Sequence, residues 1–206
     1  MAVTRAALGF RLHTGWAAVV AVAGRPGKLE ILLRKRIELL PANGAIPRFV
    51  YHRAAEMERP AAEALVKRAA AAARKTARVA LADMVDDLRA NSVHIIAAGV
   101  PTGSTSVPPD LAKILAAHPW LHAAEGKLFQ KAVAGACEAS ALHVACPRER
   151  DLWPFAAERY GMSADTFRKA LDDLRRSVGP PWSADQKTAA AVALLALAES
   201  RATARP

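Results

Sequence analysis

A short segment with two histidines and a glutamate carries the best local metal-binding pattern in this chain of 206 residues. His122 and Glu125 are three residues apart in a predicted helix and therefore share one of its faces. Imidazole and carboxylate groups are ligands for zinc, and His118 at the start of the helix is a third candidate. Pro119 in the first turn is expected to point the side chain of His118 away from the other two candidate ligands. The alternative is a polar helix start in which the helix dipole stabilises the carboxylate.

Two polar loops that follow predicted strands are candidates for anion binding. In the loop 147–151, Arg148 and Arg150 can clamp a phosphate while the two acids of the loop orient them. The loop 102–106, Thr-Gly-Ser-Thr-Ser, offers backbone amides and hydroxyls, but it lacks the lysine and the spacing of a P-loop. Ligands tend to bind beyond the carboxyl ends of parallel strands. The alternatives are solvated arginines beside a helix cap and an ordinary polar loop.

The net charge of +10, from 29 basic and 19 acidic side chains, favours a polyanionic partner. Lys67, Arg74 and Arg78 form a basic stripe along a predicted long helix, and such a stripe can follow a phosphate backbone. The alternatives are a solvated helix face and a basic composition that comes from codon bias. No uncharged apolar run approaches the ~20 residues of a membrane span, so no membrane partner is expected. The two cysteines lack CxxC spacing, which is typical of a cytoplasmic protein.

The hydrophobic pattern predicts an alternation of strands and helices that defines the fold class. Strands are expected over 6–12 and 15–23, which can form one long bent strand, and over 28–40, 46–52, 93–100 and 141–146. Helices are expected over 53–90 (interrupted or kinked at Pro60), 110–117, 119–140 and much of 150–201, with Ser163 and Ser183 as caps. Short connections imply antiparallel pairing, and strands separated by helices imply parallel pairing. We therefore expect an α/β fold with a mixed five-stranded sheet and the order βββαβαβα. One domain is expected over 1–206, with its core at about 5–146 and a helical C-terminal part at about 150–201.

Two motifs resemble a known family. The segment Asp185-Gln-Lys-Thr-Ala-Ala-Ala-Val-Ala has an acid at a helix start followed by small residues, and Gly9 is followed by Gly15-Trp-Ala. The first motif resembles the C-terminal helix of RuvC-type Holliday-junction resolvases, and the second is similar in spacing to their first hairpin. The segment 122–129 is also similar to segments of bacterial proteins with this fold. The resemblance implies a ribonuclease H-like fold, in which Asp185 corresponds to a metal-binding carboxylate.

The chain departs from this family where the metal chemistry needs acids. That chemistry requires several carboxylates that hold paired divalent metals about 4 Å apart. The first strand has Arg11 and His13 where the resemblance predicts an aspartate, and the strand 93–100 ends without an acid. A guanidinium at a metal position would repel Mg²⁺ and can bind a phosphate instead.

Three functions are compatible with these observations. The leading hypothesis is a non-catalytic ribonuclease H-like domain that contacts nucleic acid and needs no cofactor. The residues expected along the former active-site edge are Arg11, His13, Arg148, Arg150 and Lys187, and Asp185 is expected to pair with Arg11 or Lys187. The second hypothesis is a divergent nuclease that uses Asp185, Glu125 and His13 around Mg²⁺ or Mn²⁺. The third is an interaction module whose protein partner packs on the alanine-rich helices.

Overall fold

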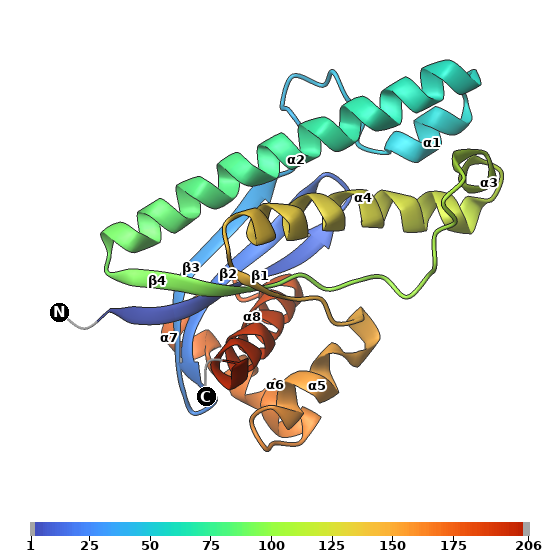
Figure 1. The fold of residues 1–206 in the computed structure, drawn as a ribbon. Helices are drawn as coiled ribbons and strands as arrows, with labels where there is room; N and C mark the ends of the chain where they lie inside the picture. Colours follow the sequence, from blue (N-terminus) through green and yellow to red (C-terminus); the bar gives the residue numbers. More distant parts are fainter. Residues whose placement is uncertain (1–2, 204–206) are drawn as a thin grey trace.

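The computed structural model describes residues 3–203, and a five-stranded sheet with the order β3-β2-β1-β4-β5 lies at its centre (Figure 1). The strands are β1 (Thr4–His13), β2 (Trp16–Arg25), β3 (Lys28–Glu38), β4 (Val93–Gly99) and β5 (His143–Ala145). β1, β2 and β3 form an antiparallel meander, whereas β4 pairs parallel with β1 and β5 pairs parallel with β4. This is the mixed sheet that the sequence predicts.

Helices cover both faces of the sheet. They are α1 (Val50–Ala55), α2 (Arg59–Ala90), α3 (Leu111–Leu115), α4 (His118–Ala139), α5 (Leu152–Glu158), α6 (Ala164–Asp173), α7 (Arg175–Val178) and α8 (Ala184–Thr203), with a short 3₁₀ helix at Glu149–Asp151. Leu8 and Phe10 of β1 pack in the core beneath α2 and α4, whereas Ala7 packs with α8 on the other face. The alternation follows from the period of two in a strand. Figure 1 shows α2 and α4 on one side of the sheet and α5, α6 and α8 on the other.

α8 lies unusually close to the sheet because two glycines make room for it. A side chain at Gly9 in β1 would overlap the carbonyl oxygen of Ala189, and one at Gly99 in β4 would overlap that of Val192. The whole tract from 189 to 197 is buried against β1, β2 and β4. The alanines of α8 are therefore core residues that let a helix backbone rest on a sheet backbone.

Two serine caps that the sequence predicts are confirmed. Ser163 Oγ accepts from the Thr166 N–H at the start of α6. Ser183 Oγ accepts from the Gln186 N–H, and Gln186 Oε1 accepts from the Ser183 N–H. The second arrangement is a reciprocal capping box that fixes the first turn of α8.

The segment between β3 and α2 differs from the prediction. The predicted strand 46–52 is wrong, because 50–55 forms α1, with Val50 and Ala54 buried at helical spacing. The interruption predicted at Pro60 is confirmed as a break between α1 and α2, and Pro60 lies in the first turn of α2. A proline is tolerated there because the first turn leaves its N–H groups unpaired anyway. No helix within residues 3–203 combines the length and the apolar character needed to cross a bilayer.

Candidate functional site

The carboxyl end of β1 faces the first turn of α8. Arg11 and His13 are two residues apart in β1, so both lie on the same face of the sheet. Gly9, two residues earlier on that face, allows the backbone at Ala189 to approach. Asp185, in the first turn of α8, consequently lies beside both Arg11 and His13.

Arg11 lies between two carboxylates. Its Nη2 is 2.9 Å from Glu149 Oε1, and its Nε is 3.8 Å from Asp185 Oδ1. Asp185 Oδ2 is 3.0 Å from His13 Nε2, although these two atoms do not form an aligned hydrogen bond. The side chains of Arg11 and Asp185 are 26% and 33% exposed, so water screens their interaction only in part, whereas the Glu149 side chain is 49% exposed. The guanidinium therefore neutralises acids from two separate elements.

These residues do not fit the paired-metal site that the resemblance to RuvC-type resolvases implies. Such a site needs several carboxylates that converge on divalent ions. Here Asp185 and Glu149 converge on Arg11, whose guanidinium is permanently charged and repels a divalent cation. The nuclease alternative also needs Glu125 next to Asp185 and His13. Glu125 lies instead on α4, where its carboxylate contacts α1.

A stack of side chains continues this site onto β2 and β3. The rings of His13 and Trp16 are 4.1 Å apart between centroids and tilted by only 7°, and the guanidinium carbon of Arg36 is 4.0 Å from the Trp16 ring centroid. Arg36 Nε also donates to Glu38 Oε1 at 2.8 Å. Trp16 is a site residue that sequence reasoning misses. The turn at Gly15 is the signal that could have found it, because that turn pairs Trp16 with His13.

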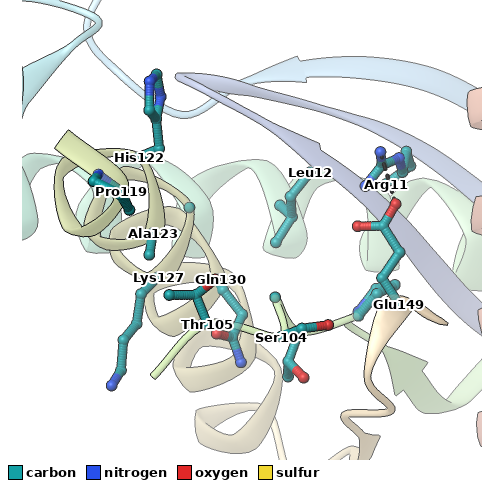
Figure 2. Close-up of a pocket in the computed structure, with 14 residues that line it drawn as sticks. Arg11, Leu12, Ser104, Thr105, Pro119, His122, Ala123, Lys127, Gln130 and Glu149 are labelled. Carbon is teal, nitrogen blue, oxygen red and sulfur yellow. Dashed lines mark ion pairs between the residues drawn. The ribbon is translucent and has the colours of Figure 1, made fainter. Parts of the chain in front are cut away.

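A cavity of about 500 Å³ opens beside Arg11 (Figure 2). Arg11 and Glu149 lie on one side, and His122 and Lys127 of α4 lie on the other. The loop 102–105 after β4 contributes its hydroxyl side chains between them. The cavity thus joins the carboxyl ends of two parallel strands to α4, which is where open sheets commonly bind ligands.

The predicted phosphate clamp lies next to this cavity. Thr102 and Arg148 form a parallel bridge, so the loop after β5 runs beside the loop after β4. Arg148 and Arg150 are exposed, and Arg150 Nε is 3.6 Å from Asp151 Oδ1. Lys187 turns away from Asp185 and pairs with Asp172 of α6 at 2.6 Å. The structure therefore brings the backbone of the arginine loop beside the cavity, although neither Arg148 nor Arg150 lines it, and it draws Lys187 away.

Basic side chains link the cavity to the long helix α2. The predicted stripe is exposed along α2 and consists of Lys67, Arg74 and Arg78. A second cavity, of about 450 Å³, is lined by Arg74 together with Lys127 and Lys131 of α4. A hollow of about 310 Å³ follows along α2 and is lined by Arg74, Lys75 and Arg78. Within residues 3–203, neither of these two cavities has an acidic lining residue. Lys127 and Lys131 escape sequence reasoning because only the packing of α4 on α2 brings them to the stripe.

The predicted metal-binding segment at the start of α4 is divided between two places. His118 and His122 approach each other, with their Nε2 atoms 2.9 Å apart. The expectation that Pro119 turns His118 away is wrong, since His118 is the first residue of α4 and shares a face with His122 one turn later. Glu125 is only 2% exposed and accepts the Tyr51 N–H at 2.7 Å. Burial raises the pKa of Glu125, and its hydrogen bonds to α1 oppose that shift.

Comparison with solved structures decides the fold. No protein-family model matches the chain, and neither does any curated protein. T. thermophilus RuvC in complex with Holliday junction substrate superposes with a TM-score of 0.52 at 13% identity, over 98% of this chain and 96% of RuvC. The Thermus thermophilus RuvC structure gives 0.51 at 14% identity, over 97% and 96%. The chain has a ribonuclease H-like fold. The predicted fold class and the resemblance to RuvC-type proteins are thereby confirmed, and at this identity the ribonuclease H-like fold alone carries over.

Proposed function

We propose that this chain binds nucleic acid along the basic side chains that run from the cavity at Arg11 to α2, and that it does so without cleaving the bound strand. The observation that carries the proposal is the continuity of this surface. The first and second cavities share Lys127, and the second cavity and the hollow on α2 share Arg74. We call this surface the basic track, and it consists of Lys127, Lys131, Arg74, Lys75 and Arg78.

The chemistry of the track suits a phosphate backbone. Lys127 and Lys131 are one turn apart on α4, and Arg74 and Arg78 are one turn apart on α2, so each pair spans about 6 Å along its helix. All four side chains are exposed. Arrays of exposed cations release counterions from nucleic acid on binding and give an affinity that depends little on sequence.

Arg11 and the arginines of the loop 147–151 have different roles in this proposal. Arg11 neutralises Asp185 and Glu149, so these two acids do not repel a phosphate that approaches from the track. Arg148 and Arg150 are exposed on the loop that runs beside Thr102 of the cavity, and they are available to a phosphate there. T. thermophilus RuvC has been solved in complex with a Holliday junction substrate, which makes branched DNA the first ligand to test.

The test is fluorescence anisotropy with labelled duplex, four-way junction and single-stranded DNA and RNA over a range of salt concentrations. Wild-type affinity should fall steeply with salt, with a log–log slope of about −0.9 per phosphate contacted on B-DNA. Lys127→Glu and Arg74→Glu should each weaken binding, and replacing either residue by alanine should reduce the magnitude of the slope by about one. Arg148→Glu should also weaken binding, whereas Asp185→Asn should leave it largely intact.

Lys28→Glu is the matched control, because Lys28 is exposed at the start of β3, at the opposite end of β2 and β3 from Trp16. Equal losses in this variant and in Lys127→Glu would mean that net charge, and not the basic track, drives binding. Parallel incubations with Mg²⁺ and Mn²⁺ test for cleavage. Cleavage that Asp185→Asn abolishes would replace this proposal with the divergent nuclease.

A further inference from the structure

Three histidines from two helices meet at one end of the molecule. His52 of α1 and His118 and His122 of α4 each bring a ring nitrogen within 4.8 Å of those of the other two. Their ring centroids are 4.5 to 5.5 Å apart. His118 and His122 are largely exposed and His52 is half-buried, so the cluster is open to solvent on one side.

The buried carboxylate of Glu125 holds the third histidine in place. Glu125 Oε1 accepts the N–H groups of Tyr51 and His52, at 2.7 and 3.3 Å, and thereby binds the first turn of α1 to α4. The same oxygen is 3.3 Å from His52 Nδ1. A carboxylate at Nδ1 favours the tautomer that carries its proton there, which leaves Nε2 of His52 with a free lone pair.

We propose that His52, His118 and His122 bind a divalent transition-metal ion of the Zn²⁺ type, with Glu125 as the group that orients His52. Imidazole nitrogens suit Zn²⁺, Cu²⁺ and Ni²⁺, whereas Mg²⁺ and Ca²⁺ prefer oxygen ligands. Three nitrogens at 2.0–2.1 Å from a tetrahedral zinc are about 3.4 Å apart. The observed cluster is close to this size, and exposed side chains at 118 and 122 can make the small adjustment.

Several features distinguish this arrangement from an ordinary polar cluster. The side chain of Glu125 is almost fully buried, and its second oxygen, Oε2, has no hydrogen-bond partner among the described residues. Burying a carboxylate is costly unless it has a charged or hydrogen-bonded partner. A metal ion on His52 supplies positive charge next to that carboxylate. Carboxylate, histidine and metal in series are a common arrangement in zinc proteins.

The site would have three protein ligands and one open position. Structural zinc sites usually have four protein ligands, while three ligands leave a place for water or an exchangeable group. His122 also lines the cavity beside Arg11, so the ion would lie at the edge of that cavity. The metal site is separate from the carboxylates around Arg11 and does not depend on the proposed function.

The experiment measures metal binding directly with tag-free protein that has been treated with a chelator. Competition against a chromophoric zinc chelator gives the affinity and stoichiometry, and Co²⁺ absorption in the visible range reports tetrahedral nitrogen coordination. Wild type should bind one Zn²⁺, and His118→Ala and His122→Ala should each lose this site and its Co²⁺ spectrum. Glu125→Gln should weaken binding by about 10- to 100-fold, as expected for the loss of an orienting carboxylate.

His94→Ala is the matched control, because His94 is exposed on β4 and lies outside the cluster. It should bind Zn²⁺ as tightly as wild type. His118 and His122 are exposed, so their variants should keep the wild-type circular dichroism, and a loss of binding then reports on the ligands. The proposal is overturned if wild type binds no stoichiometric Zn²⁺, or if His118→Ala and His122→Ala bind it as tightly as His94→Ala does.

Discussion

Arg34 connects the sheet to the start of α8, and its removal should loosen that connection. Its guanidinium donates to three backbone carbonyls, those of Val178, Gly179 and Pro181, at 2.6, 3.0 and 2.7 Å. These carbonyls belong to the last residue of α7 and to the segment that follows it, just before the capping box at Ser183. Arg34 therefore positions the first turn of α8 and, through it, Asp185.

The expected loss of stability on removal of Arg34 follows from these three hydrogen bonds. A hydrogen bond to a charged group contributes about 1.5–3 kcal/mol in a buried setting. The Arg34 side chain is only half-buried and one of its three bonds is exposed, so water replaces part of what is lost. We expect Arg34→Ala to lower the free energy of unfolding by about 2–3 kcal/mol. Arg34→Lys should recover less than half of this loss, because an ammonium group lacks the planar fork that reaches several carbonyls.

Urea denaturation measures the global effect, and hydrogen exchange across 178–187 measures the local one. Exchange should accelerate in this segment while the buried tract from 189 to 197 stays protected, since apolar packing holds that tract. Arg25→Ala, an exposed change at the end of β2, is the control and should stay within about 0.5 kcal/mol of wild type. An Arg34→Ala variant as stable as the control, with unchanged exchange across 178–187, would refute this reasoning.

Two further predictions concern buried positions. Gly9→Ala should destabilise the fold by about 1–3 kcal/mol or more in thermal unfolding, since the added methyl group would overlap the Ala189 carbonyl. The control is Gly126→Ala on the exposed face of α4, which should be neutral or stabilising in the same assay. Burial raises the pKa of Glu125 in the folded state above its usual 4.5. Protonation of this carboxyl therefore stabilises the folded state at low pH, and this contribution is lost as the pH rises through the folded-state pKa. Wild type should therefore lose stability relative to Glu125→Gln over that window in urea titrations at stepped pH. Parallel stability curves would contradict this account of Glu125.

The sheet could be predicted from the sequence because its signals are local. Glycine-marked turns separate the first three strands, and an apolar run marks β4, an inner strand of the sheet. The prediction of a strand at 46–52 is wrong for a physical reason. Val50 and Tyr51 belong to a short apolar segment that suits a strand as well as a helix, and the helix forms there because Glu125 of the distant α4 accepts hydrogen bonds from the first turn of α1.

Because the sequence predicts 46–52 as a strand, it does not indicate that His52 belongs to the histidine cluster. The spacing of His118 and His122 is visible in the sequence, but His52 joins them only because 50–55 is a helix packed against α4. The role of Glu125 was equally hidden. Its position three residues after His122 suggests a shared ligand face, whereas its burial and its contact with α1 make it a partner of His52 instead.

The carboxyl end of the sheet shows how one cation can change the chemistry that this fold permits. Period-two alternation alone places Arg11 and His13 on one face of β1, and this much follows from the sequence. No local pattern reveals that Glu149, 138 residues later, pairs with the same guanidinium as Asp185. Two carboxylates that approach one another, here the half-buried Asp185 and the exposed Glu149, repel each other unless a cation neutralises them. In a ribonuclease H-like nuclease the bound metals supply that charge. Here the guanidinium of Arg11 supplies it from within the chain, and the acids can therefore remain in place without a metal.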